Sequence, residues 1–257
     1  MNAAIYYHPE AYTTSGPKLM GRNAAGESFL RGFIQYSKTN EFWAQVQKPE
    51  HGQHFAQTVK AQGRTELVKV VDKSSLSALQ QIGTVYYPGP DLGRHAFHRS
   101  LAGGLGSSAN NPHSAWSLCG ITHTTSSAGA MDALAELITA PIQTWDAVIC
   151  TSAAVKDNVQ RLLQAQVHYV EHRLGISKLV LPMMPVIPLG IHTQDFVFSD
   201  LQKSEARLAI GADNNTLVVL FMGRLSFHAK AHPLAMYQAL QKASQSAKLQ
   251  GQKVVLV

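Results

Sequence analysis

The amino-acid sequence predicts an α/β fold, in which a parallel β-sheet is covered by helices on both faces. Short apolar runs alternate with segments of helical periodicity along most of the chain, as in successive βαβ units. The chain opens with a short apolar strand at residues 3–7, then a glycine-bearing loop and an amphipathic helix, as nucleotide-binding α/β units do. A content of 45% hydrophobic and 15% charged residues in 257 allows a sizeable core.

The remaining strands of the first part of the chain are predicted from short apolar runs that end at glycine, proline or polar residues. They occupy residues 42–46, 66–71, 83–87, 116–123, 147–150 and 185–191. Helices are predicted at residues 24–37, 51–62, 74–81 and 132–140, and another after Ser152. We expect Ser152 to be an N-cap, because serine is strongly preferred there and the sequence contains no GxSxG nucleophile motif.

The segment between residues 92 and 112 is less regular. Arg94, His95, His98 and Arg99 are predicted to form a small basic cluster on a helix. The stretch that follows, residues 103–111, is rich in Gly, Ser and Asn and is predicted to be a mobile loop.

A group of possible anion-binding residues follows six apolar residues, Leu217–Met222, which predict a buried strand. Gly223 ends this strand, Arg224 stands at its carboxyl end, and Lys230 follows in a polar loop before a helix that begins at Pro233. Two cations at a strand end beside a helix N-terminus suit an anion such as a diphosphate. The alternative is that both are ordinary surface cations.

The last part of the chain predicts the beginning of a second α/β domain. A helix capped by Ser199 runs to Leu208, a further helix occupies residues 234–248, and a valine-rich strand occupies residues 253–257. We therefore expect a first domain over residues 1–195, and a linker with the start of a second domain over residues 196–257.

The composition limits the partners and the location of the protein. A net charge of +6 and a pI near 9.3 favour anionic partners, but no Lys/Arg run or aromatic–basic stripe points to nucleic acid. Cys119 and Cys150 lie in apolar runs and are expected to pack as small hydrophobic residues. With no signal-peptide pattern and no run of about 18 apolar residues, we expect a cytoplasmic protein and leave peripheral membrane contact open.

The twelve histidines do not predict a metal site. Several pairs have helical spacing, but none has an HExxH frame or a CxxC partner. The chain also contains no Asp-x-Asp, the pattern of metal-dependent nucleotide-sugar binding. His123 ends its strand beside small hydroxyl residues, where it is placed either to meet a ligand or to fill a structural role.

Four segments resemble motifs of glycosyltransferase family 4, which has the GT-B fold of two Rossmann-like domains. Gly223-Arg224-Leu225 followed by Lys230 resembles the motif that opens the C-terminal domain of this family, with one extra residue between the cations. Ala25-Gly26-Glu27 resembles the Gly-Gly-x-Glu start of its first helix. The segment from Asp146 to Ser152 resembles its Asp-x-(Val/Ile)-x-x-x-Ser strand end. The segment Pro185–Ile191 resembles its Ile-Pro-x-Gly-(Val/Ile)-Asp interdomain link, with His192 in place of the usual Asp.

The resemblance implies a metal-independent enzyme that retains anomeric configuration. Its substrates would be a nucleotide-diphosphate sugar and a glycan, lipid or small-molecule acceptor, with no cofactor. Arg224 and Lys230, after Gly223, would hold the donor diphosphate, and His123 would face the transferred sugar as the catalytic candidate. Gly26 would let a phosphate or the acceptor approach the helix N-terminus, although helix packing alone also explains a glycine there.

The chain end leads to two expectations. The family's second domain continues well beyond the strand that ends at Val257, so we expect a fragment that is inactive alone. The alternative is a truncated, non-catalytic α/β binding protein derived from such an enzyme. An NAD-dependent oxidoreductase was a third possibility, but its GxGxxG fingerprint does not follow the first strand.

Overall fold

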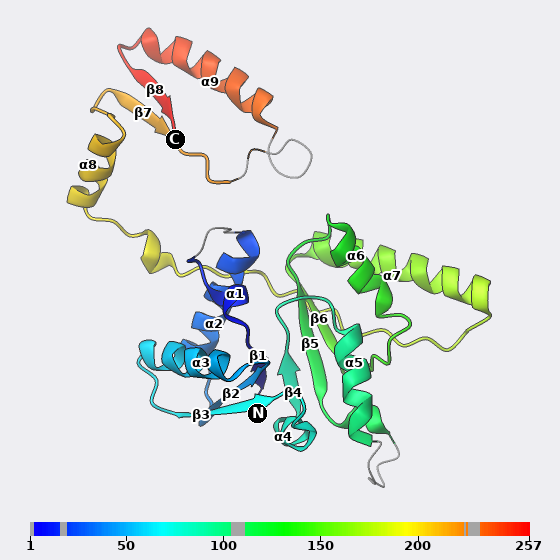
Figure 1. Ribbon diagram of the computed structural model, residues 1–257. Coiled ribbons are helices and arrows are strands. Elements are labelled where there is room, and N and C mark those ends of the chain that lie inside the picture. Colours follow the sequence, from blue (N-terminus) through cyan, green and yellow to red (C-terminus); the bar gives the residue numbers. More distant parts are fainter. Residues whose placement is uncertain (1–2, 16–19, 104–110, 224, 226–231) are drawn as a thin grey trace. The chain divides into compact units, whose positions relative to one another are not determined.

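The chain forms two compact units, Met1–Ile191 and His192–Val257, each with its own sheet (Figure 1). The structure is a computed structural model and describes residues 3–15, 20–103, 111–223, 225 and 232–257. Residues 104–110 of the loop expected to be mobile lie outside the described residues.

The first unit is built on a six-stranded sheet whose paired strands are all parallel, which confirms the predicted α/β class. Its strands are β1 (Ala4–Tyr6), β2 (Glu41–Val46), β3 (Leu67–Asp72), β4 (Thr84–Tyr86), β5 (Ser117–Thr122) and β6 (Ala147–Cys150). The order β3-β2-β1-β4-β5-β6 is that of a Rossmann-like sheet. Successive strands extend the sheet in opposite directions from β1, so the switch point lies between β1 and β4.

Helices connect these strands, largely where helical periodicity predicted them. They are α1 (Pro9–Tyr12), α2 (Gly21–Tyr36), α3 (Pro49–Ala61), α4 (Leu76–Ile82), α5 (Gly93–Ser100), α6 (Ala128–Glu136) and α7 (Ala153–Leu174), with short 3-10 turns η1 (Leu101–Gly103) and η2 (Pro112–Ser114). The four-residue α1 was not predicted. Helix α6 begins earlier than predicted, and residues 137–140 form hydrogen-bonded turns before Pro141.

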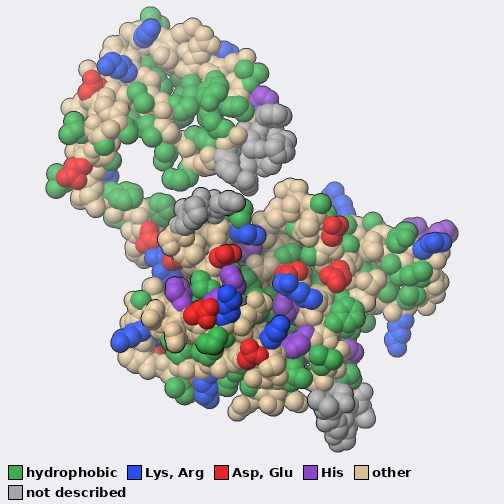
Figure 2. Space-filling model, in the orientation of Figure 1, with side chains coloured by type: hydrophobic (Ala, Val, Ile, Leu, Met, Phe, Trp, Pro, Cys, Tyr) green, Lys and Arg blue, Asp and Glu red, His purple; other side chains and the backbone are tan. Residues whose placement is uncertain are grey.

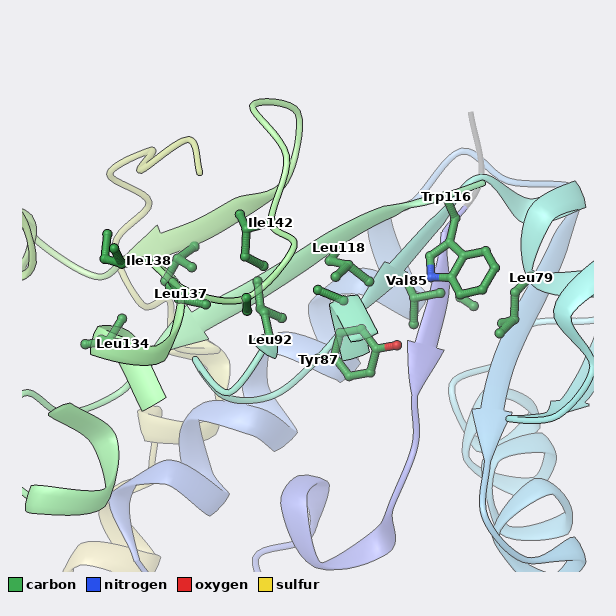
Figure 3. Packing of buried hydrophobic residues seen from close by; sticks show 14 of the residues in the cluster. Leu79, Val85, Tyr87, Leu92, Trp116, Leu118, Leu134, Leu137, Ile138 and Ile142 are labelled. Carbon is green, nitrogen blue, oxygen red and sulfur yellow. The ribbon is translucent and has the colours of Figure 1, made fainter. Parts of the chain in front are cut away.

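Alternate residues of the strands pack in two separate hydrophobic cores, because successive side chains of a strand point to opposite faces of the sheet. Val85 and Tyr87 pack in one core with residues of α4, α6 and α7, whereas Tyr86 packs in the other with residues of α2 and α3. Figure 3 shows part of the first core, running from Leu79 and Trp116 past Leu118 to Leu134. The sheet is therefore covered on both faces, as the sequence predicted.

Helix α7 is fixed at both ends by local sequence. The side chain of Ser152 accepts a hydrogen bond from the backbone N–H of Val155 at 3.1 Å, which confirms it as the N-cap. Gly175 ends the helix in a left-handed conformation, with φ of 69°. Ser152 therefore has a structural role that needs no catalytic explanation.

Arg99 corrects the predicted basic cluster. The four cationic candidates do lie on a helix, α5, but Arg99 is completely buried and forms a bidentate ion pair with Asp146, at 2.7 and 2.8 Å. It also donates to the carbonyl oxygens of Trp116 and Pro141. Arg99 therefore has a structural role in the protein interior, where its buried guanidinium needs a carboxylate for its charge and acceptors for its N–H groups.

The predicted strand at residues 185–191 is wrong. The chain runs beside β6 and makes only two isolated bridges, from Met183 to Ala147 and from Val186 to Cys150. Pro185 explains the interruption, because it lacks an N–H between Met183 and Ile187, whose N–H groups donate to Asp146 and Cys150.

The second unit comprises the turn η3 (Thr193–Phe196), α8 (Asp200–Ala209), β7 (Thr216–Val219), α9 (Pro233–Lys248) and β8 (Lys253–Leu256). Ser199 caps α8 in a reciprocal capping box with Gln202, which confirms the predicted cap. Arg207 holds the turn after α8 by donating to the carbonyl oxygens of Asp213 and Thr216.

The strand predicted as buried at residues 217–222 is shorter and more exposed than expected. β7 ends at Val219 and pairs in parallel with β8 in a two-stranded sheet. Leu217 is 47% exposed and Met222 is 86% exposed. A two-stranded sheet leaves part of its apolar surface in water, whereas a continuous apolar run predicts a strand covered on both faces.

The two cysteines are free and lie in the sheet, as predicted: Cys150 is buried and Cys119 is half-buried. Burial raises the pKa of the Cys119 thiol to about 11, so it remains protonated at neutral pH. Along the described stretches of the chain, no helix combines the length and the apolar character needed to cross a membrane.

Candidate functional site

A cavity of about 470 Å³ lies at the carboxyl ends of the strands that flank the switch point. It takes its lining from the ends of β1, β4 and β5 and from the first turns of α2, α5 and α6. The lining residues are Tyr6, Arg22, Tyr87, Pro88, Gly89, Pro90, Asp91, Arg94, His95, His123, Thr124, Ser127, Gly129, Ala130 and Ala133. Open parallel sheets bind their ligands at this position, and the volume falls in the usual range for small-molecule sites.

One wall of the cavity is aromatic. The rings of Tyr87 and His95 are stacked, with centroids 3.7 Å apart and planes inclined by 25°. Tyr6 lies beside both, at 5.2 Å from Tyr87 and 5.5 Å from His95. Burial, followed by the charge of Arg94, lowers the pKa of His95 to about 3. The wall therefore carries no charge at neutral pH.

The charged residues of the cavity are unequally paired. Arg94 forms an ion pair with the carboxylate of Asp91 and donates from Nε to His95 Nε2 at 3.3 Å. Arg22, at the start of α2, is exposed and forms no ion pair with the residues that the structure describes. Figure 2 shows basic, acidic and histidine side chains close together on the visible face of the first unit.

His123 lies directly after β5 and lines the cavity, in agreement with its predicted place at a strand end. Burial, and then the positive charge of Arg22, lower the pKa of His123 below its ordinary value of 6.5. Its Nδ1 atom is shielded from solvent and has no hydrogen-bond partner within the described chain. The imidazole is thus neutral at neutral pH and offers one nitrogen as a donor and the other as an acceptor.

The first turn of α6 forms a further part of the lining. Ser127 is the N-cap, but its side chain makes no capping hydrogen bond there, and the first turn contains no acidic residue. The lining residues of this helix are small: Gly129, Ala130 and Ala133. The first backbone N–H groups of a helix have no intrahelical partner, so they are available to a ligand with negative charge.

The loop after β4 passes very close to β5. A Cβ atom at Gly120 would lie 2.6 Å from the carbonyl oxygen of Gly89. That same oxygen accepts the N–H of Ile121 at 3.2 Å. Gly120 therefore lets the Pro88-Gly89-Pro90 turn lie over the sheet and form the floor of the cavity.

Gly26 does not line the cavity. It is buried in α2, where an added Cβ would lie 2.0 Å from the carbonyl oxygen of Ala11. The close approach of α1 and α2 gives the glycine a packing role, and a phosphate or acceptor contact at Gly26 stays a prediction.

The predicted diphosphate site belongs to the second unit. Gly223 follows β7 in a bend with φ of 157°. Arg224 and Lys230 lie outside the described residues, so their roles remain predictions.

Sequence reasoning identified His123 but missed Tyr6, Tyr87, Arg22 and the Asp91–Arg94 pair. These residues come together because β1 and β4 are neighbours, and no local pattern reveals that pairing.

Among the residues that the structure describes, no three His, Cys, Asp or Glu side chains are grouped to hold a metal ion. Comparison of the chain with protein-family models, curated proteins and solved structures found no match.

Proposed function

We propose that this chain belongs to a metal-independent glycosyltransferase of the GT-B type, which moves a sugar from a nucleotide-diphosphate sugar to an acceptor hydroxyl. The observation that carries the proposal is His123, which lines the switch-point cavity in the neutral form. A second support is the sequence of Gly223-Arg224-Leu225 followed by Lys230, which resembles a family 4 motif. This segment would hold the donor diphosphate.

The chemistry follows from the residue types. A neutral imidazole can hydrogen-bond a sugar hydroxyl without placing a like charge beside an oxocarbenium-like transition state. The carboxyl ends of β4 and β5 present this group together with backbone and hydroxyl dipoles. Arg224 and Lys230 would stabilise the charge that builds on the departing diphosphate, which is the task that a divalent cation performs in other transferases.

Donor binding tests the proposal directly. We expect saturation-transfer NMR with UDP-, GDP- and ADP-sugars to show the sugar protons of at least one donor in contact with the protein. The His123→Ala variant should weaken that donor about tenfold, since one hydrogen bond contributes about 1–1.5 kcal/mol. The matched control is His172→Ala, which removes an exposed imidazole of α7 outside the cavity.

The outcomes separate the two functions weighed from the sequence. Release of nucleoside diphosphate in the presence of an acceptor would identify a transferase. Donor binding without release would agree both with the non-catalytic binding protein and with the inactive transferase fragment expected from the resemblance. No contact with any donor, or equal loss in both histidine variants, would contradict the proposed role of His123.

A further inference from the structure

The cavity has an excess of positive charge. Arg22, Asp91 and Arg94 are the charged residues of its lining, and Asp91 is already paired with Arg94. His95 and His123 are neutral at neutral pH. One guanidinium, that of Arg22, therefore faces the cavity without a compensating carboxylate in the described part of the chain.

The surroundings of Arg22 favour an anion with several acceptor oxygens. His123 lines the same cavity and lies close enough for the charge of Arg22 to act on it. The first turn of α6 adds backbone N–H groups and the positive end of the helix dipole to the same cavity. A guanidinium presents a planar fork of donors that matches a phosphate better than a neutral hydroxyl.

The remaining lining suits a small polyhydroxylated body. Tyr6, Tyr87 and His95 form an uncharged aromatic wall, and Thr124 and Ser127 supply hydroxyl groups. The volume of about 470 Å³ accommodates a molecule of sugar-phosphate size.

We propose that this cavity binds a phosphorylated acceptor, a small sugar or polyol whose phosphate monoester is held by Arg22 and the first turn of α6. That the ligand is an acceptor rests on the proposed function. Binding of a phosphate in this cavity does not require the chain to transfer a sugar. The donor diphosphate is assigned to the second unit, so the phosphate in this cavity is the acceptor's own.

Titration of the His123 ring by NMR tests this site without donor or turnover. The His123→Gln variant identifies the His123 Cε1–H signal by its loss. Glucose 6-phosphate is expected to raise the pKa of His123 by about half a unit, because a nearby anion favours the imidazolium. Glucose should leave that pKa unchanged.

Two arginine variants supply the matched comparison. In Arg22→Gln, the response to glucose 6-phosphate should disappear, and the pKa of His123 in the free protein should rise because a neighbouring cation is gone. In Arg161→Gln, which removes the same charge from an exposed position on α7, both values should stay as in the unsubstituted chain. Far-UV circular dichroism verifies that both variants are folded.

UDP distinguishes the source of the phosphate. A pKa shift with UDP but not with glucose 6-phosphate would overturn the proposal and assign the anion site to the donor. No Arg22-dependent shift with either probe would also overturn it. A chain that responds to glucose 6-phosphate but neither binds nor turns over nucleotide sugars retains the phosphate site and loses only the proposed function.

Discussion

At the residue scale, the pairing of Arg99 with Asp146 links three parts of the first unit. Asp146 accepts both bonds from Arg99 and also the backbone N–H groups of Leu118 and Gln143, each at 2.8 Å. The pair thereby joins α5 to β5 and to the turn before β6. These four bonds give Asp146 a structural role in the first unit.

Removing Arg99 should therefore destabilise the fold. We expect Arg99→Met to lower the free energy of unfolding by about 3–5 kcal/mol, because it leaves the buried Asp146 carboxylate without its counter-charge. Urea denaturation followed by circular dichroism measures this change.

The control lies on the same helix. Arg94→Met breaks an ion pair whose arginine is 65% exposed, and we expect a loss below about 1 kcal/mol. Similar losses in the two variants would show that burial of Arg99 does not determine its contribution.

At the element scale, two of the glycines of α2, Gly26 and Gly32, have opposite surroundings. Gly26 faces the backbone of Ala11 in α1, whereas an added Cβ at Gly32 would meet nothing within 4 Å. The two positions separate the cost of a steric contact from the intrinsic preference of a helix for alanine.

We expect Gly26→Ala to destabilise the protein by about 1–3 kcal/mol, since α1 and α2 must move apart. Gly32→Ala should instead stabilise it by about 0.5–1 kcal/mol, because alanine loses less backbone entropy in a helix. Thermal unfolding of both variants measures whether each substitution lowers or raises the stability of the fold.

A ligand measurement distinguishes packing from a phosphate contact at Gly26. If Gly26 serves packing alone, the Gly26→Ala variant, once shown to be folded, should keep the response of His123 to glucose 6-phosphate. Loss of that response without loss of stability would support the predicted phosphate role of Gly26.

At the scale of the whole molecule, buried and half-buried histidines make stability depend on pH. Burial is the largest cause that lowers the pKa of five of them: His51, His95, His98, His113 and His123. The folded chain therefore binds fewer protons than the unfolded chain as the pH falls below the ordinary histidine pKa of 6.5. Stability is complete above that value and is lost on acidification, for His95 down to about pH 3.

We expect the urea midpoint to fall steadily between pH 7.5 and 5. Each histidine that stays neutral in the folded state contributes up to about 1.4 kcal/mol per pH unit below its unfolded pKa. His95→Gln should reduce this slope, whereas His172→Gln, at an exposed position on α7, should not. A pH-independent midpoint would contradict the neutral buried histidines.

The secondary structure of the first unit was largely predictable from the sequence because its signals are local. Val, Ile and aromatic runs marked the strands, Ser152 marked the start of α7, and alternating elements indicated a parallel sheet. An exception also has a local cause: Pro185 interrupts the ladder beside β6 where apolar composition alone suggested a strand.

The site depended on relations that no local pattern contains. The sequence by itself determined the α/β class, the helix caps and the position of His123 at a strand end, because backbone propensity and periodicity act between near neighbours. Only the tertiary structure decided that β1 lies beside β4, that Arg99 is buried against Asp146, and that Arg22 shares a cavity with His123. Strand order and burial arise from packing between distant segments, so they set the charge of the cavity and the ligand it can hold.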